Sequence, residues 1–230
     1  LKMMLDKQKN NQPFVLGLPG GVSPNKVYEQ LIRMHKEENV SFKNLVVFNT
    51  YEYYPVTDET QSNLYNIKEI FLNKIDIKEE NIFSPNVMVE KDKILESCEQ
   101  YDRDLKQFGG LDYLLLGLGS KGNIGFNMPG SNAYSQTRLV VLDGDSINDA
   151  ATIFGTKDKV PASAITMGLS DMLDAQKITL IAWGEQKAES LQMMVEGPAT
   201  DTVPASMLQT HASVIAVVDL LAADNLARIS

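Results

Sequence analysis

Cysteine and histidine are scarce in this sequence. Its 230 residues include one cysteine, Cys98, and two histidines, His35 and His211. A single cysteine excludes an internal disulfide and favours a reducing, cytoplasmic location. With so few nitrogen and sulfur ligands we expect no zinc site, and we expect no other metal or cofactor. Cys98 lies at helical spacing from Ile94 and Tyr101, which predicts a core residue rather than a nucleophile.

Positive charge and long apolar runs are also in short supply. Lysine and arginine number 21 against 30 acidic residues, which gives a formal charge of −9. Nucleic acids and anionic membranes attract clustered positive charge, so we expect neither as a partner. No apolar run approaches the roughly 20 residues that cross a bilayer, and no signal peptide is visible. The chain starts at Leu1 rather than Met, which leaves open a targeting segment ahead of it.

Short apolar runs alternate with amphipathic segments along the chain. We predict helices from residue 24 to about 36, from Ser62 onward, over 90–106 and after 185. We predict strands at residues 14–18, 45–49, 113–118, 137–142, 178–184 and 213–219. The alternation predicts one domain over residues 1–230, an α/β fold with a doubly wound, mainly parallel, Rossmann-like sheet and helices on both faces.

A glycine-containing turn, Pro19-Gly-Gly-Val-Ser-Pro24, follows the first predicted strand. Ser23 suits the N-cap of the next helix and Pro24 suits its first position. Backbone amides at a helix start, together with the helix dipole, favour a bound phosphate group. We therefore predict an anion site at this turn. The alternative is a tight connection that uses glycine only for its backbone freedom.

A second glycine-rich segment follows the strand predicted at residues 113–118. It reads Gly119-Ser-Lys-Gly-Asn-Ile-Gly-Phe-Asn-Met-Pro-Gly-Ser131. A turn of this kind at the end of a buried parallel strand lets backbone amides approach a ligand closely. We expect the ligand site of the sheet at this loop.

This loop resembles the signature loop of the glucosamine-6-phosphate deaminase (isomerase) family, which reads Gly-x-Asp-Gly-His-Ile-Ala-Phe-Asn-Glu-Pro; 6-phosphogluconolactonase is a more distant relative. Residues 17–24, Gly-Leu-Pro-Gly-Gly-Val-Ser-Pro, are likewise similar to the family's turn Gly-Leu-Pro-Thr-Gly-x-Thr-Pro. The resemblance extends from Phe14 to Asp219. It implies the α/β fold of the family, with one strand and most of a helix missing ahead of Leu1.

The resemblance also locates the family's acid–base residues, and this chain replaces all of them. Lys121, Asn123 and Met128 stand where the signature loop has its Asp, His and Glu, and Tyr51 stands where the family has the Asp that takes the proton from C2. An amide and a thioether cannot transfer a proton, and a phenol with a pKa of about 10 is a poor base near neutral pH. These replacements predict that ordinary deaminase turnover is lost. Glu52, beside Tyr51, is the nearest candidate substitute, although adjacent residues on an extended segment point to opposite sides.

Phosphate ligands are implied in the same way. The turn of Gly20, Gly21, Val22 and Ser23 matches the family segment that holds the sugar phosphate, and Lys187 matches the phosphate-binding lysine of a Gly-x-x-Lys-Ala motif. Arg138 matches an arginine that is associated with an allosteric phosphate site. His211 falls in a segment similar to Ser-x-Leu-Gln-x-His, and we expect it to be structural and satisfied by the backbone.

Two functional hypotheses follow. The first is a catalytically impaired member of the family that binds a sugar phosphate through the glycine turn and Lys187, or that only pairs with other subunits. The second is an active isomerase, deaminase or lactonase on a related phosphosugar that uses Glu52, Lys121 and Tyr51, with Lys121 as a desolvated base. The replaced acid–base residues favour the first. Family members are often hexamers, so a homo-oligomer is also an expectation.

Overall fold

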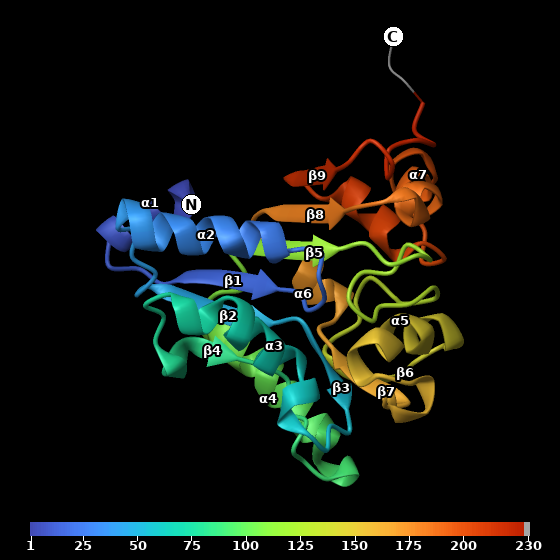
Figure 1. The fold of residues 1–230 in the computed structure, drawn as a ribbon, viewed down its shortest axis with the longest axis horizontal. Helices are drawn as coiled ribbons and strands as arrows, with labels where there is room; N and C mark the ends of the chain where they lie inside the picture. Colours follow the sequence, from blue (N-terminus) through green and yellow to red (C-terminus); the bar gives the residue numbers. More distant parts are fainter. Residues whose placement is uncertain (228–230) are drawn as a thin grey trace.

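Six parallel strands form the larger of two sheets in the computed structural model, which describes residues 1–227 apart from the side chain of Thr152 (Figure 1). Their order is β4-β2-β1-β5-β8-β9. The strands span Phe14–Leu18 (β1), Leu45–Asn49 (β2), Ile82–Phe83 (β4), Tyr113–Gly117 (β5), Ile178–Ala182 (β8) and Val214–Val218 (β9). The predicted doubly wound, mainly parallel sheet is confirmed.

The strand order reverses between β1 and β5. From β1 the chain adds β2 and then β4 on one side, and it returns to place β5, β8 and β9 on the other. Connections on the two sides of this switch point turn away from one another, which leaves a crevice at the carboxyl ends of β1 and β5. Figure 1 shows the strands pointing toward the region occupied by α5 and the smaller sheet.

Helices cover both faces of the large sheet, because alternate residues of each strand point to opposite sides. Leu45 and Val47 of β2 pack with Tyr28 and Phe71 in one core cluster. Phe48, on the same strand, belongs to the cluster on the other face. The helices are Lys2–Lys9 (α1), Asn25–Glu38 (α2), Asn63–Ile70 (α3), Ile94–Gln107 (α4), Gly144–Phe154 (α5), Leu169–Leu173 (α6) and Ala188–Glu196 (α7).

A second, antiparallel sheet was not predicted. It has the order β3-β7-β6 and consists of Tyr51–Tyr54 (β3), Arg138–Val141 (β6) and Ser163–Thr166 (β7). Thr50 is the residue at which the chain passes from one sheet to the other. Its amide donates to the Leu18 carbonyl at 3.0 Å, and its carbonyl accepts from the Met167 amide at 2.8 Å. The strand predicted at residues 137–142 is therefore real but belongs to this second sheet.

The start of α2 differs from the prediction. The helix begins at Asn25 with Pro24 as its N-cap, so Pro24 is not the first helical residue and Ser23 does not cap the helix. The helix also continues to Glu38, beyond the predicted end at Lys36. Ser62, in contrast, caps α3 as expected, because its Oγ accepts a hydrogen bond from the Tyr65 amide at 3.0 Å.

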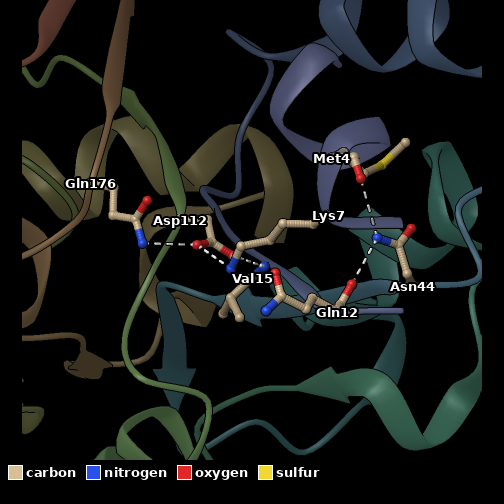
Figure 2. A network of polar contacts seen from close by, with 7 residues as sticks. All are labelled: Met4, Lys7, Gln12, Val15, Asn44, Asp112 and Gln176. Carbon is tan, nitrogen blue, oxygen red and sulfur yellow. Dashed lines mark hydrogen bonds and ion pairs between the residues drawn. The ribbon is translucent and has the colours of Figure 1, made fainter. Parts of the chain in front are cut away.

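Asp112 organises the opposite end of the large sheet, where the strands begin (Figure 2). Its carboxylate is 2% exposed and accepts hydrogen bonds from the Val15 amide at 2.8 Å and from Gln176 at 3.0 Å. Lys7 of α1 forms an ion pair with it at 2.6 Å. Asn44 adds hydrogen bonds to the carbonyls of Met4 and Gln12. These contacts fix α1 against the sheet, far from the carboxyl ends of the strands.

The carboxyl groups of Asp102, on α4, and Asp171, on α6, are buried and half-buried respectively. Asp102 is 4% exposed, and neither its Oδ1 nor the Oδ2 of Asp171 has a hydrogen-bond partner. Burial raises the pKa of Asp102. Burial and the charge of Asp102 raise the pKa of Asp171 to about 6, with a smaller contribution of the same sign from Asp174, while Lys106 opposes the rise. The folded protein thus binds a proton on Asp171 more tightly than the unfolded chain does.

We expect Asp171 to make stability depend on pH. Its stabilising contribution is complete below its unfolded pKa of 3.8 and disappears as pH rises through about 6. Asp171→Asn should therefore raise the free energy of unfolding by roughly 1 to 3 kcal/mol at about pH 7.5, and by roughly half as much near pH 5. Urea denaturation at both pH values measures this difference. Asp6→Asn, an exposed acid on α1, is the control, and equal pH dependence in all three proteins would contradict the prediction.

Candidate functional site

A pocket of about 290 Å³ occupies the crevice at the switch point. Four segments and Lys187 line it: the turn after β1, the start of β3, the glycine-rich loop after β5 and one face of α5. The large sheet thus supplies the floor, and the second sheet with α5 supplies the opposite wall. The lining residues that could contact a ligand through a polar side chain or through the glycine turn are Gly20, Gly21, Val22, Ser23, Tyr51, Tyr53, Asn123, Ser146, Asp149 and Lys187.

The turn at residues 19–23 is held from both sides. Tyr28 donates a hydrogen bond to the Pro19 carbonyl at 3.2 Å, and the Trp183 indole donates to the Ser23 carbonyl at 3.0 Å. Gly20 lies against Asn63, whose Oδ1 would be 2.4 Å from a Cβ at this position. Gly21 has φ +80°, a conformation that glycine adopts without strain. The turn is therefore a fixed, glycine-dependent edge of the pocket.

Lys187 reaches the same pocket from the segment between β8 and α7. It is the last residue of the 3₁₀ turn Glu185–Lys187 and is half-buried. Burial lowers the pKa of its ammonium group, and the nearby charge of Asp149 opposes this effect. The structure thus brings together all five predicted phosphate ligands, although about 160 residues separate the turn from Lys187.

Tyr51 and Asn123 also line the pocket, but neither can accept a proton near neutral pH. The Tyr51 ring packs edge-on against Phe126 with a centroid distance of 4.7 Å, and burial raises the pKa of the phenol well above 10. The Asn123 side chain donates to the Gly125 carbonyl at 3.1 Å. It lies so close to Gly119 that a Cβ there would be 1.9 Å from its Oδ1. Both side chains therefore have packing roles in the pocket wall.

Lys121 and Met128 lie outside the pocket. The Lys121 ammonium forms ion pairs with Asp143 and Asp145, each at 2.8 Å, and these raise its pKa. The hypothesis of Lys121 as a desolvated base is therefore wrong, because its surroundings hold the proton rather than release it. Met128 is half-buried, and its sulfur accepts a weak hydrogen bond from Ser146 at 3.8 Å.

Glu52 points away from the pocket, as expected for a neighbour of Tyr51 on a strand. It is 1% exposed, and its carboxylate accepts hydrogen bonds from the backbone amides of Asn63 at 2.9 Å and Leu64 at 2.6 Å. Burial raises its pKa, and these hydrogen bonds oppose the rise. Glu52 thus holds the start of α3 and is not placed to act on a ligand in this pocket.

Arg138 supports the glycine-rich loop instead of facing the pocket. Its guanidinium donates to Asn127 at 2.9 Å and to Ser131 at 3.1 Å. Asn127, fully buried, donates in turn to the carbonyls of Ile124 and Met167. These contacts tie the loop to β6 and to the end of β7. An allosteric phosphate at Arg138 stays a prediction.

Sequence reasoning missed the wall formed by α5. Its pocket-facing residues are Ser146, Asp149, Ala150 and Ile153, at the i, i+3, i+4 and i+7 spacing of one helix face. The spacing itself was visible in the sequence, and so was an aspartate, a residue type that commonly caps helices, three positions before Ser146. In the structure Asp143 is the N-cap and accepts a hydrogen bond from the Ser146 amide at 2.8 Å. What the sequence did not reveal is that this face covers the switch point.

His211 and Cys98 have structural roles. His211 bonds the Ala175 carbonyl at 2.6 Å and accepts from the Ser213 amide, as predicted. Cys98 is buried on α4, and burial raises the pKa of its thiol to about 11. Across residues 1–227, no three His, Cys, Asp or Glu side chains are grouped so as to hold a metal ion. In the same range no helix has the length and apolar character of a bilayer span.

Comparisons with known proteins agree with the motif evidence. Residues 1–216 match the sequence family of glucosamine-6-phosphate isomerases and 6-phosphogluconolactonases. A glucosamine-6-phosphate deaminase-like protein of Bacteroides thetaiotaomicron is 52% identical over 97% of this chain, but the chain spans only 34% of that relative. The glucosamine-6-phosphate deaminase of Clostridium perfringens is 41% identical, and the match covers 95% of this chain and 90% of the relative.

Solved structures give the same result. A monomeric glucosamine-6-phosphate deaminase superposes with a TM-score of 0.91 at 34% identity, covering 97% of this chain and 92% of that one. The 6-phosphogluconolactonase of Thermotoga maritima shares the fold with a TM-score of 0.73 at 20% identity, covering 94% and 90% of the two chains. Family match, sequence identity and fold coincide, and this chain therefore belongs to the glucosamine-6-phosphate isomerase/6-phosphogluconolactonase family of carbohydrate metabolism.

Proposed function

We propose that this protein binds a phosphorylated sugar in the switch-point pocket and does not turn it over at the rate of a glucosamine-6-phosphate deaminase. The observation that carries the binding proposal is the convergence of the glycine turn before α2 and of Lys187 on one small pocket. Backbone amides of a glycine turn that leads into a helix and one half-buried ammonium group are complementary to a phosphate. The deaminase names of the relatives favour an aminosugar phosphate as the ligand class.

The ionisable side chains that line the pocket support the proposal of lost turnover. They are Tyr51, Tyr53, Asp149 and Lys187. Burial raises the pKa of both phenols, that of Tyr53 to about 12, so both stay protonated near neutral pH. Asp149 is the one carboxylate among the described lining residues, and it is exposed on α5. None of the four family acid–base positions carries a group that exchanges a proton at neutral pH.

The alternative is an active isomerase, deaminase or lactonase, and the same geometry reduces the number of residues that could serve as its catalytic groups. Glu52 and Lys121 lie outside the pocket, and Tyr51 retains its proton. An enzyme working in this pocket would have to use Asp149, which is therefore the residue to examine if turnover is found.

Lys187→Gln tests the binding proposal. Loss of a charge-assisted hydrogen bond of about 1.5 to 3 kcal/mol should weaken glucosamine 6-phosphate binding roughly 10- to 150-fold. Isothermal titration calorimetry and ligand-induced shifts in melting temperature measure the effect. Lys43→Gln removes an exposed lysine near the opposite end of the strands and should bind like the wild type. Equal affinities for the wild type and Lys187→Gln, or no binding to either, would overturn the proposal.

A further inference from the structure

Asp149 has a fixed place at the rim of the pocket. Its helix, α5, starts at a defined N-cap, Asp143, and is anchored by Ala150 and Phe154, which are 2% and 4% exposed. Phe154 packs edge-on against Tyr53 with a centroid distance of 5.0 Å. Ala150, next to Asp149 in the chain, lies in the same core cluster as Phe126 of the glycine-rich loop. The Asp149 carboxylate is therefore presented by a packed helix and not by a loose loop.

Asp149 and Lys187 are the two formally charged side chains among the described residues that line the pocket. They come from different walls, one from α5 and the other from the segment before α7. Their charges influence one another, because Asp149 raises the pKa of Lys187, and Asp149 also raises the pKa of Tyr53. The pocket is thus electrostatically two-sided, positive at Lys187 and negative at Asp149.

The opposite charges of Lys187 and Asp149 affect which ligands the pocket binds. A phosphate held at Lys187 lies within the field of the Asp149 carboxylate, and like charges brought together in a site weaken binding. An ammonium group on the same ligand is attracted to the Asp149 carboxylate, and this attraction offsets the repulsion between Asp149 and the phosphate. A ligand with hydroxyl groups alone gains a hydrogen bond but no ion pair.

We propose that Asp149 is a specificity-determining residue, which disfavours bare phosphate and favours a phosphosugar with an amino group over one with hydroxyl groups only. The inference rests on the proposed binding function, since it assigns a role within the same pocket. It concerns selection among ligands and gives Asp149 no proton to transfer.

The test compares three ligands and three proteins. Affinities of inorganic phosphate, glucose 6-phosphate and glucosamine 6-phosphate are measured by calorimetry on the wild type, Asp149→Asn and Asp145→Asn. The control Asp145→Asn removes the same charge from the same helix, but Asp145 pairs with Lys121 outside the pocket. Measurements at low ionic strength preserve the effect, because Asp149 is exposed and salt screens it.

Asp149→Asn should bind inorganic phosphate about 3- to 10-fold more tightly than the wild type. It should also reduce the preference for glucosamine 6-phosphate over glucose 6-phosphate by about 10-fold, while Asp145→Asn leaves both quantities unchanged. Equal changes for all three ligands, or no change, would overturn the role of Asp149 and leave the binding function intact. Failure of the wild type to bind any of the three would overturn the binding function and, with it, this inference.

Discussion

Glu52→Ala should lower the free energy of unfolding by about 3 to 5 kcal/mol, because it removes a buried charged acceptor and leaves its partners unsatisfied. The backbone amides of Asn63 and Leu64 lose their acceptor at the start of α3, where a negative charge also offsets the helix dipole. The Asn49 side chain, which donates to Glu52 at 2.9 Å, loses its partner as well. Glu52→Gln, which retains one acceptor oxygen, should cost less.

Urea denaturation followed by circular dichroism measures the loss, and we expect the melting temperature to fall by about 6 to 20 °C. Glu59→Ala is the matched control, since Glu59 is exposed in the 3₁₀ turn just before α3 and its removal should change stability by less than about 0.5 kcal/mol. Unchanged stability in Glu52→Ala, with ligand binding or turnover lost, would make Glu52 a functional residue and contradict its structural role.

The sequence was sufficient to predict the parallel sheet and the convergence of the residues predicted to bind phosphate. Both follow from one physical rule. Short, uninterrupted apolar runs are strands buried on both faces, and parallel strands bring their carboxyl ends to one edge. The turn after β1 and Lys187 after β8 consequently meet, although they lie far apart in the chain. Family resemblance then predicted a phosphate ligand for these positions.

The second sheet could not be predicted because β3 follows β2 after a single residue. Residues 45–54 look like one strand and its extension, and only the pairing of β3 with β7, which also pairs with β6, separates them. That pairing joins Tyr51 to Thr166, more than 100 residues away. No local pattern encodes a contact over such a distance.

The roles of individual charged residues were hidden for the same reason. The role of Lys121 follows from its ion pairs with Asp143 and Asp145. The role of Glu52 follows from the hydrogen bonds that it accepts from backbone amides at the start of α3. Asp149 belongs to the site only because α5 turns one face toward the switch point. The residue type showed that each could be charged, but its partners, and hence its chemistry, required the fold.

We expect no deaminase turnover above background. Tyr51 is held protonated by burial and Lys121 by two aspartates, while Asn123 and Met128 have no proton to exchange. Positioned acid–base groups contribute about 10² to 10⁴-fold each, and their effects are not additive. A deficit of at least about 10⁴-fold relative to an active glucosamine-6-phosphate deaminase is therefore the expected result.

The most direct measurement follows occupancy and turnover in the same sample. The protein is mixed with excess glucosamine 6-phosphate, the shift in melting temperature reports binding, and ammonia and fructose 6-phosphate report reaction. The deaminase of Clostridium perfringens serves as the active reference. At a ligand concentration of about 100 times Kd, binding should raise stability by about 2.7 kcal/mol and the melting temperature by about 5 to 11 °C, with no ammonia above the buffer control. Ammonia released in proportion to protein concentration, at a rate near that of the reference and lost in Lys187→Gln, would contradict the account.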